Sequence, residues 1–247
     1  MVAWRASMLL LLLASFTTAA EPATRPVDRR LIDDALARLA DPEPAARDSG
    51  RLWLMGLQPA ELPRLVEAAA ARPLRPAQGV ALREIILYVL TRDALRQTPT
   101  RDNKTFLGVR LPSVFAYTAD ESTIPVGIPV LYRLPGFAGQ RFFEEGDVIL
   151  GFSLRDRVEW VRTRDELMNV INQFKPGEII TAVVQRAGRT FDVPVTLDAR
   201  PTPGGAGEEE QYEQHYLMLT NLIHQAQADA ERAYAERYAA ALRVDAD

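Results

Sequence analysis

The stretch IITAVVQRAGRTFDVPVTL, residues 179–197, has the pattern of a β-hairpin. Its first arm is rich in β-branched residues, and Ala187-Gly188 is typical of a tight two-residue turn. In the second arm polar positions alternate strictly with the apolar residues Phe191, Val193, Val195 and Leu197. The alternation predicts one buried and one solvated face. Pro194 lacks a donor, so it predicts a sheet edge or a missing donor that points outward.

The segments before the hairpin predict further strands and one helix. Three segments are rich in β-branched and large apolar residues and are expected to form strands: Phe106 to Tyr117, Gly127 to Leu134, and Val148 to Phe152. A helix is expected at Thr163 to Phe174, with Thr163 as N-cap and Glu166 at the reciprocal capping-box position. Its buried stripe is Leu167, Val170, Ile171 and Phe174. Residues 103–199 are therefore expected to form an α+β domain.

Six short motifs occur in order within this region. They are Phe106-Leu107-Gly108-Val109, Leu134-Pro135-Gly136-Phe137-Ala138, Glu145-Gly146-Asp147-Val148-Ile149, Asp165-Glu166-Leu167, Lys175-Pro176-Gly177-Glu178 and Arg186-Ala187-Gly188-Arg189. Each motif alone is weak, but the ordered set covers nearly the whole of ~95 residues and is specific. With these motifs the region resembles a PDZ domain, of the type attached to bacterial periplasmic serine proteases.

The resemblance implies a partly open β-barrel or sandwich capped by helices, with a peptide-binding groove. A partner's C-terminal tail would add as an extra strand along Val109 to Phe115, beside the helix Thr163 to Phe174. The turn Phe106-Leu107-Gly108-Val109 would offer successive backbone N–H groups to the terminal carboxylate, and Gly108 lets this turn curl. Leu107 and Val109 would line the pocket for the last side chain.

The resemblance also assigns candidate site residues. The peptide-binding set is Phe106, Leu107, Gly108, Val109, Arg110, Leu111, Glu166 and Val170. On the helix, the groove-facing positions are expected to be Glu166, Asn169 or Val170, and Gln173. Positive potential near the carboxylate would come from Arg101, Lys104 or Arg110.

Two inserts depart from the PDZ pattern. Thr118 to Ile124 lengthens the segment after the binding strand, and Ser153 to Arg162 lengthens the connection before the helix. The sequence is therefore compatible with two alternative functions. An open groove would make the chain an adaptor that binds C-terminal or extended peptide segments. An occluded groove would make it a structural or assembly subunit.

The region before the strands, residues 27–97, has a helical period. The first helix is expected to follow Asp28 as N-cap, and its apolar face is Leu31, Ile32, Ala35, Leu36 and Leu39. Further helices are expected at Pro44 to Leu57, at Glu61 to Ala71 and at about Ala77 to Leu90. The run Asp41-Pro42-Glu43-Pro44-Ala45-Ala46-Arg47, followed by Leu62-Pro63-Arg64-Leu65-Val66, resembles a HEAT-type repeat. The likeness covers about one repeat and a half, so a compact helical bundle is the other interpretation.

The C-terminal region is expected to be a linker, residues 200–210, and one long amphipathic helix, residues 211–243. An apolar 4-3 spacing runs through Tyr212, Tyr216, Leu219, Ile223, Ala226, Ala230 and Ala233. Such a coiled-coil-like seam, which ends in small alanines, permits close approach to another surface. A homo-oligomer formed through this helix is one option.

Composition excludes several classes of function. The net charge of -4 gives no reason to expect nucleic acid as a partner. The chain has no cysteine, so it has neither disulfides nor thiolate metal sites. The two histidines, His215 and His224, both lie on the last helix, and no Gly-x-Ser-x-Gly motif occurs. We therefore expect no catalytic residues, no metal and no cofactor: the protein is not an enzyme.

The first twenty residues have the pattern of a cleaved secretory signal. Arg5 supplies the positive start, Met8 to Phe16 the apolar core, and Thr18-Ala19-Ala20 the cleavage site. The apolar core is shorter than the ~20 residues of a spanning helix, and no later segment is long and apolar enough to cross a membrane. We expect a periplasmic or secreted protein that is attached to no membrane after cleavage.

Overall fold

The computed structural model describes residues 26–98, 104–112, 127–154, 157–201 and 211–242, the last range without the side chains of 211–216. The predicted signal sequence, most of the predicted linker, residues 113–115 of the predicted binding strand, and the insert at 118–124 lie outside these residues. The seam positions Tyr212 and Tyr216 also fall outside the described side chains.

The N-terminal region is helical, as expected. It contains α1 (Arg29–Leu39), α2 (Pro44–Leu54), the 3-10 turn η1 (Pro59–Glu61), α3 (Leu62–Ala70) and α4 (Pro76–Arg96). The predicted N-cap Asp28 accepts a hydrogen bond of 2.9 Å from the backbone amide of Arg30. Helix α4 extends beyond the predicted end at Leu90. Leu95 is buried there against Phe137 of the middle region, which explains the extra turns.

The middle region is mixed α+β with antiparallel sheets. Its larger sheet has the strands β3 (Ile128–Pro129), β5 (Val148–Leu154), β7 (Ile179–Arg186) and β8 (Arg189–Thr196) in that order, with β6 (Arg157–Trp160) on β5. Two small ladders pair β1 (Thr105–Phe106) with β9 (Asp198–Ala199), and β2 (Val109–Arg110) with β4 (Tyr132–Arg133). Helices α5 (Ala138–Phe142) and α6 (Arg164–Ile171) complete the region.

The strands before residue 134 are shorter than the sequence predicts. The expected strand from Phe106 onward is broken after two residues, because Gly108 adopts a positive φ of 69° that no strand contains. The expected strand Gly127 to Leu134 is likewise divided into β3 and β4, which pair with different partners. The break at Gly108 shapes the candidate site.

The hairpin β7–β8 has its predicted two-residue turn, with positive φ at Ala187 and Gly188. Strand β8 stands at the edge of the larger sheet. A two-residue turn makes Arg186 and Arg189 a hydrogen-bonded pair, and pairs alternate from there. Pro194 therefore falls in a non-hydrogen-bonded pair, and its missing donor lies on the outer edge, as predicted.

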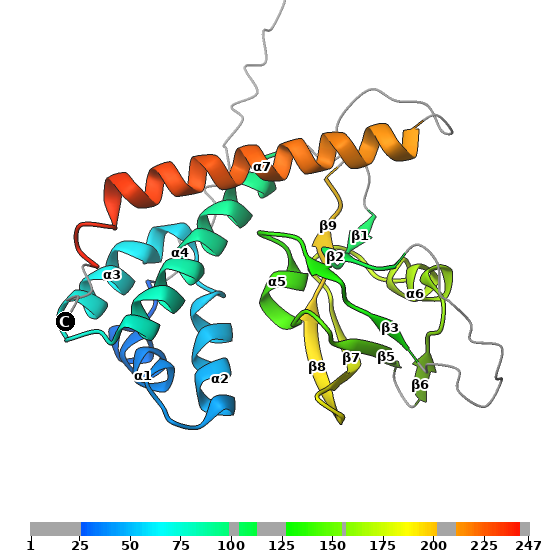
Figure 1. The fold of residues 1–247 in the computed structure, drawn as a ribbon, viewed down its shortest axis with the longest axis horizontal. Coiled ribbons are helices and arrows are strands. Elements are labelled where there is room, and N and C mark those ends of the chain that lie inside the picture. Colours follow the sequence, from blue (N-terminus) through cyan, green and yellow to red (C-terminus); the bar gives the residue numbers. More distant parts are fainter. Residues whose placement is uncertain (1–25, 99–103, 113–126, 155–156, 202–210, 243–247) are drawn as a thin grey trace, which may run out of the picture.

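The C-terminal helix α7 (Gln211–Arg237) crosses the molecule above both regions (Figure 1). It packs against α4 and buries Ile223, Ala226 and Ala230, three positions of the predicted seam. Beyond it, Tyr238 and Leu242 join the core of the helical region. These three seam positions are thus covered within this chain, and oligomerisation through the helix stays a prediction. None of the helices in the described ranges has the length and apolar character needed to span a membrane.

Candidate functional site

A pocket of about 320 Å³ lies between strand β2 and helix α6. It is lined by Phe106, Leu107, Gly108, Val109, Arg110, Leu111, Leu134, Arg164, Leu167, Met168, Ile171, Arg200 and Leu219. The first six are the consecutive residues that the sequence singled out. Most of the others are apolar, and the volume is near the lower end of the range of ligand sites, ~300–1,000 Å³.

The turn before β2 directs backbone amides into this pocket. The Leu107 carbonyl accepts a hydrogen bond of 2.6 Å from the Gly139 amide, and the Gly108 carbonyl accepts one of 2.8 Å from the Leu134 amide. These peptide bonds are trans, so each N–H points opposite to the preceding carbonyl. The amides of Gly108 and Val109 therefore point away from α5 and β4, toward the pocket side.

Val109 also presents a free strand edge. Within the described residues β2 pairs only with β4, on the side where the Gly108 carbonyl is engaged. Main-chain groups of successive residues in a strand alternate between its two edges. The N–H and carbonyl of Val109 consequently lie on the edge that faces the pocket. An extended segment placed there could form main-chain hydrogen bonds to Val109.

Gly108 is sterically required in this turn. A Cβ added at this position would lie 2.1 Å from the Cβ of Phe137, in addition to the unfavourable φ of 69°. Gly139 is similarly confined, since its Cβ would lie 2.3 Å from the Gly108 carbonyl oxygen. Close packing of the Phe137 to Gly139 segment against the turn thus holds the two carbonyls and aims the amides.

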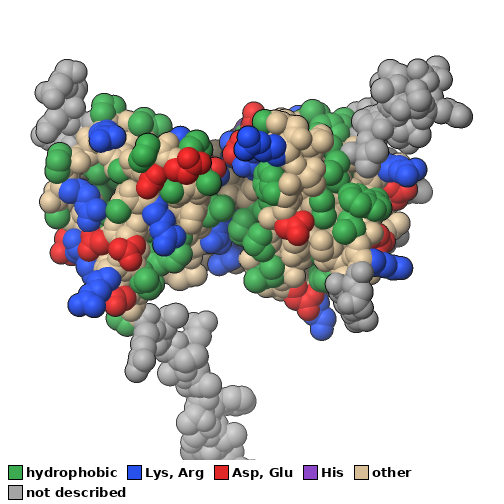
Figure 2. All heavy atoms as spheres, turned by 90° about the horizontal axis from the view of Figure 1, so that it is seen from below, with side chains coloured by type: hydrophobic (Ala, Val, Ile, Leu, Met, Phe, Trp, Pro, Cys, Tyr) green, Lys and Arg blue, Asp and Glu red, His purple; other side chains and the backbone are tan. Residues whose placement is uncertain are grey.

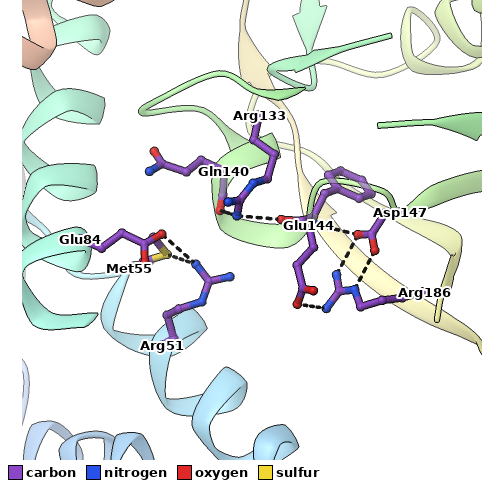
Figure 3. Close-up of polar contacts among 9 residues, drawn as sticks. Arg51, Met55, Glu84, Arg133, Gln140, Glu144, Asp147 and Arg186 are labelled. Carbon is purple, nitrogen blue, oxygen red and sulfur yellow. Dashed lines mark hydrogen bonds and ion pairs between the residues drawn. The ribbon is translucent and has the colours of Figure 1, made fainter. Parts of the chain in front are cut away.

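Polar contacts fix the segment that supports the turn. The Arg133 guanidinium of β4 donates to the Phe143 carbonyl at 3.2 Å and holds the C-terminal end of α5 (Figure 3). The buried Asp147 accepts hydrogen bonds of 2.7 and 2.8 Å from Arg186, and one of 2.7 Å from the Glu144 amide. The hydrogen bond to Asp147 raises the pKa of Arg186. These bonds tie the end of α5 to the β7–β8 hairpin.

Helix α6 turns a different face to the pocket than the sequence predicts. Arg164, Leu167, Met168 and Ile171 line it, and at ~100° per residue they cover a single arc of about 100°. Glu166 and Val170, the predicted groove residues, lie outside this arc. Glu166 accepts hydrogen bonds from the amides of Arg162 and Thr163 as the capping-box acid. Val170 is 1% exposed and belongs to the core.

Neither Asn169 nor Gln173 lines the pocket, and the same rotation accounts for them. The signal that could have placed the helix is the spacing of Leu167 and Ile171, four residues apart on the predicted apolar stripe. The third lining element, Leu219 of α7, has no local signal in the sequence. It comes from a helix more than a hundred residues from the turn.

The charged residues of the pocket lining are all basic. Three arginines, Arg110, Arg164 and Arg200, belong to the lining, and none of its residues is acidic. By contrast, basic and acidic side chains are interspersed over the face of the molecule in Figure 2. Basic lining residues beside inward-directed amides suit a carboxylate ligand. Of the cations proposed from the sequence, Arg110 lies in the lining, Lys104 does not, and Arg101 is outside the described residues.

The buried carboxyl group of Asp198 contacts the segment that packs against the turn. Asp198 of β9 accepts a hydrogen bond of 2.5 Å from the Ala138 amide, and its strand pairs with Phe106. Desolvation raises the pKa of Asp198 to about 6, although the Ala138 amide and nearby arginines act in the opposite direction. Elsewhere in the described residues, no group of three His, Cys, Asp or Glu side chains is arranged to hold a metal ion.

Comparisons with known proteins give a partial likeness. No protein-family model and no curated protein matches the chain. Among solved structures, the chain is similar to the HtrA-type protease AlgW with a decapeptide, at 24% identity over 42% of this chain and 31% of that one, with a TM-score of 0.35. It is also similar to AlgW with a tripeptide, at 27% identity over 42% and 34%, with a TM-score of 0.32. The chain thus spans about a third of those protease chains.

Proposed function

We propose that this protein is an exported, non-enzymatic interaction module that binds the C-terminal tails of other proteins in the pocket between β2 and α6. In this proposal residues 103–199 are a PDZ-like domain, and residues 27–97 are a HEAT-like helical domain. The single observation that carries it is the turn at Gly108. There two neighbouring carbonyls are tied to α5 and β4, so two amides are aimed at the pocket.

A bound tail would lie along β2 as an additional strand. Its main chain would pair with Val109 on the free edge, and its carboxylate would accept from the amides of Gly108 and Val109. Hydrogen bonds to a charged group contribute about 1.5–3 kcal/mol each. The last side chain would occupy the apolar part of the pocket, beside Leu107 and Ile171. This mode gives affinity through the main chain and selectivity through the side-chain pocket.

The remaining parts of the proposal follow from the sequence. The N-terminal pattern at 1–20 favours export to the periplasm or outside the cell. The proposal includes no catalysis, cofactor or metal, because recognition of a tail by main-chain donors needs none of them. The net charge of -4 favours protein tails over nucleic acid as partners.

A second candidate is an assembly subunit in which the pocket is a structural feature. It is favoured by α7, whose Leu219 reaches the pocket while its other end joins the helical core. In that case the PDZ-like region would hold the C-terminal helix in place and bind no foreign tail. Peptide binding separates the two candidates.

The experiment is a screen of C-terminal peptides against the mature chain, with each hit measured with a free and with an amidated end. We expect amidation to weaken binding by at least about tenfold, because the two amides lose their charged acceptor. Hits that bind equally well after amidation would refute carboxylate capture at Gly108. A screen without hits would favour the assembly role.

A further inference from the structure

Helix α7 lies outside the α+β region, yet it supplies part of the pocket wall. Leu219 is the one residue of the described pocket lining that comes from beyond Arg200. Its side chain is partly buried and packs against the buried cluster that contains Phe137, as Phe106 and Leu134 also do. Phe106 begins the turn, and Leu134 donates to the carbonyl of Gly108. Leu219 therefore stands at the end of the pocket where the carboxylate and the last side chain of a tail would sit.

The position of Leu219 is fixed from the helical region. Ile223 and Ala226, which lie further along α7, are buried with Leu95 at the end of α4. Farther along, Glu231 accepts two hydrogen bonds of 2.7 Å from Arg83 of α4. These contacts hold α7 along α4, so this helix cannot move away from the pocket without breaking its packing on the helical region.

We infer that Leu219 is a specificity-determining residue of the proposed peptide site. The inference rests on the proposed function. In it, α7 closes the pocket at the turn and limits the size of the apolar side chain that ends the tail. The preferred ligand is then a protein tail whose last residue is a mid-sized aliphatic one. Because this part of the pocket wall comes from α7, outside the PDZ-like region, peptide selectivity depends on more of the chain than that region.

The test compares two leucines of the same helix. Leu219→Ala removes the wall, whereas Leu217→Ala removes a leucine that is 60% exposed and absent from the pocket lining. Alanine favours helix at both positions. Affinities of the full mature chain are measured by fluorescence anisotropy for one peptide series that ends in Ala, Val, Leu or Phe. Leu219→Trp, which enlarges the wall, is the second variant, and circular dichroism checks that all variants are folded.

The expected result is a change in the order of affinities for the four peptides. Leu219→Ala should weaken the Val- and Leu-ending peptides about fivefold, since roughly 1 kcal/mol of apolar contact is lost, and should favour the Phe-ending peptide relative to them. Leu219→Trp should shift preference toward the Ala-ending peptide. Leu217→Ala should leave all four affinities unchanged.

Two outcomes would overturn the inference, and they are distinguishable. If wild type binds the series and Leu219→Ala behaves like Leu217→Ala, α7 is no part of the binding wall, while the proposed function stands. If wild-type protein binds none of the four peptides, with free or amidated ends, the proposed function fails and the inference fails with it.

Discussion

Strands β2 and β8 both leave one edge unpaired within the described residues, but the two edges differ in their surroundings. The outer edge of β8 carries Pro194, which removes one donor, and the exposed charged residues Arg189 and Asp192. These are common protections against accidental strand pairing. Strand β2 carries the exposed Arg110 but no proline. It faces an apolar wall from α6, and the turn before it directs amides into the same space.

The difference shows what turns a free strand edge into a recognition site. An edge alone offers main-chain groups to any extended segment and gives no selectivity. At β2 the adjacent pocket selects a side chain, and the amides of Gly108 and Val109 select a chain end. At β8 the outer edge instead carries Pro194 and exposed charged residues.

The largest effect is expected at the turn. Gly108→Ala should lower affinity for a free-ended peptide about 100-fold, because the added Cβ meets Phe137 and displaces the two amides. Gly188→Ala in the β7–β8 hairpin is the matched control. It also has a positive φ, of 77°, but its Cβ would meet nothing within 4 Å. Isothermal titration on both variants measures the difference, and equal affinities would contradict the role of the turn.

The next effect concerns the ion pair between Asp147, which follows α5, and Arg186 at the end of β7. Asp147→Ala should lower the free energy of unfolding by about 3 kcal/mol, because the carboxylate is 1% exposed and Arg186 loses its main partner. Urea denaturation measures this loss. Peptide affinity of the folded variant should stay within about twofold, since Asp147 does not line the pocket and the hydrogen bonds that hold the Leu107 and Gly108 carbonyls do not involve it. A parallel loss of affinity would show that the two edges are coupled.

A pH dependence is expected from Asp198, behind the β2 turn. Its folded pKa of about 6 lies above the ordinary value for an aspartate, so the folded state binds the proton more tightly. The contribution to stability therefore falls as pH rises from about 4 to about 6, by roughly 2–3 kcal/mol, and is constant above that range.

The measurement for Asp198 is a series of urea denaturations from pH 4 to pH 7.5 on wild type and on Asp198→Asn. The variant keeps an acceptor for the Ala138 amide but cannot titrate. We expect the stability of the variant relative to wild type to increase from pH 4 to pH 6. A constant difference would contradict the burial of this carboxyl group.

The smallest effect is expected at the outer edge of β8. Pro194→Thr restores an outward N–H on β8 and should change the free energy of unfolding by less than about 0.5 kcal/mol, because the side chain is exposed. The variant should self-associate more than wild type, as measured by analytical ultracentrifugation at several concentrations. An unchanged association state would mean that the exposed charges protect this edge without the proline.

The sequence predicts the elements that have a strong local signal. The hairpin, the N-cap of α6 and the four N-terminal helices all carry turn residues or apolar periods in a short window. The turn at Gly108 is implied by the resemblance to PDZ domains, whereas the local pattern predicts a continuous strand from Phe106 onward. The binding role of this turn stays a prediction that peptide measurements must decide.

The parts that the sequence does not predict depend on long-range packing. The rotation of α6 is set by which residues fill the core, and the stripe Leu167, Val170, Ile171 and Phe174 is too wide to choose one face. The approach of Leu219 to the pocket depends on how α7 docks along α4. The seam of α7 contains three alanines, which can pack closely against many surfaces. The local sequence pattern therefore does not identify the surface that α7 contacts.

The most direct test of the account follows the backbone amides of Gly108 and Val109 by heteronuclear NMR while a binding peptide is added. The account predicts that a free-ended peptide shifts both amide protons downfield, that its amidated form does so much less, and that amides of β8 stay unchanged. Equal shifts with both peptides, or shifts concentrated on β8, would contradict recognition of a chain end at the β2 edge.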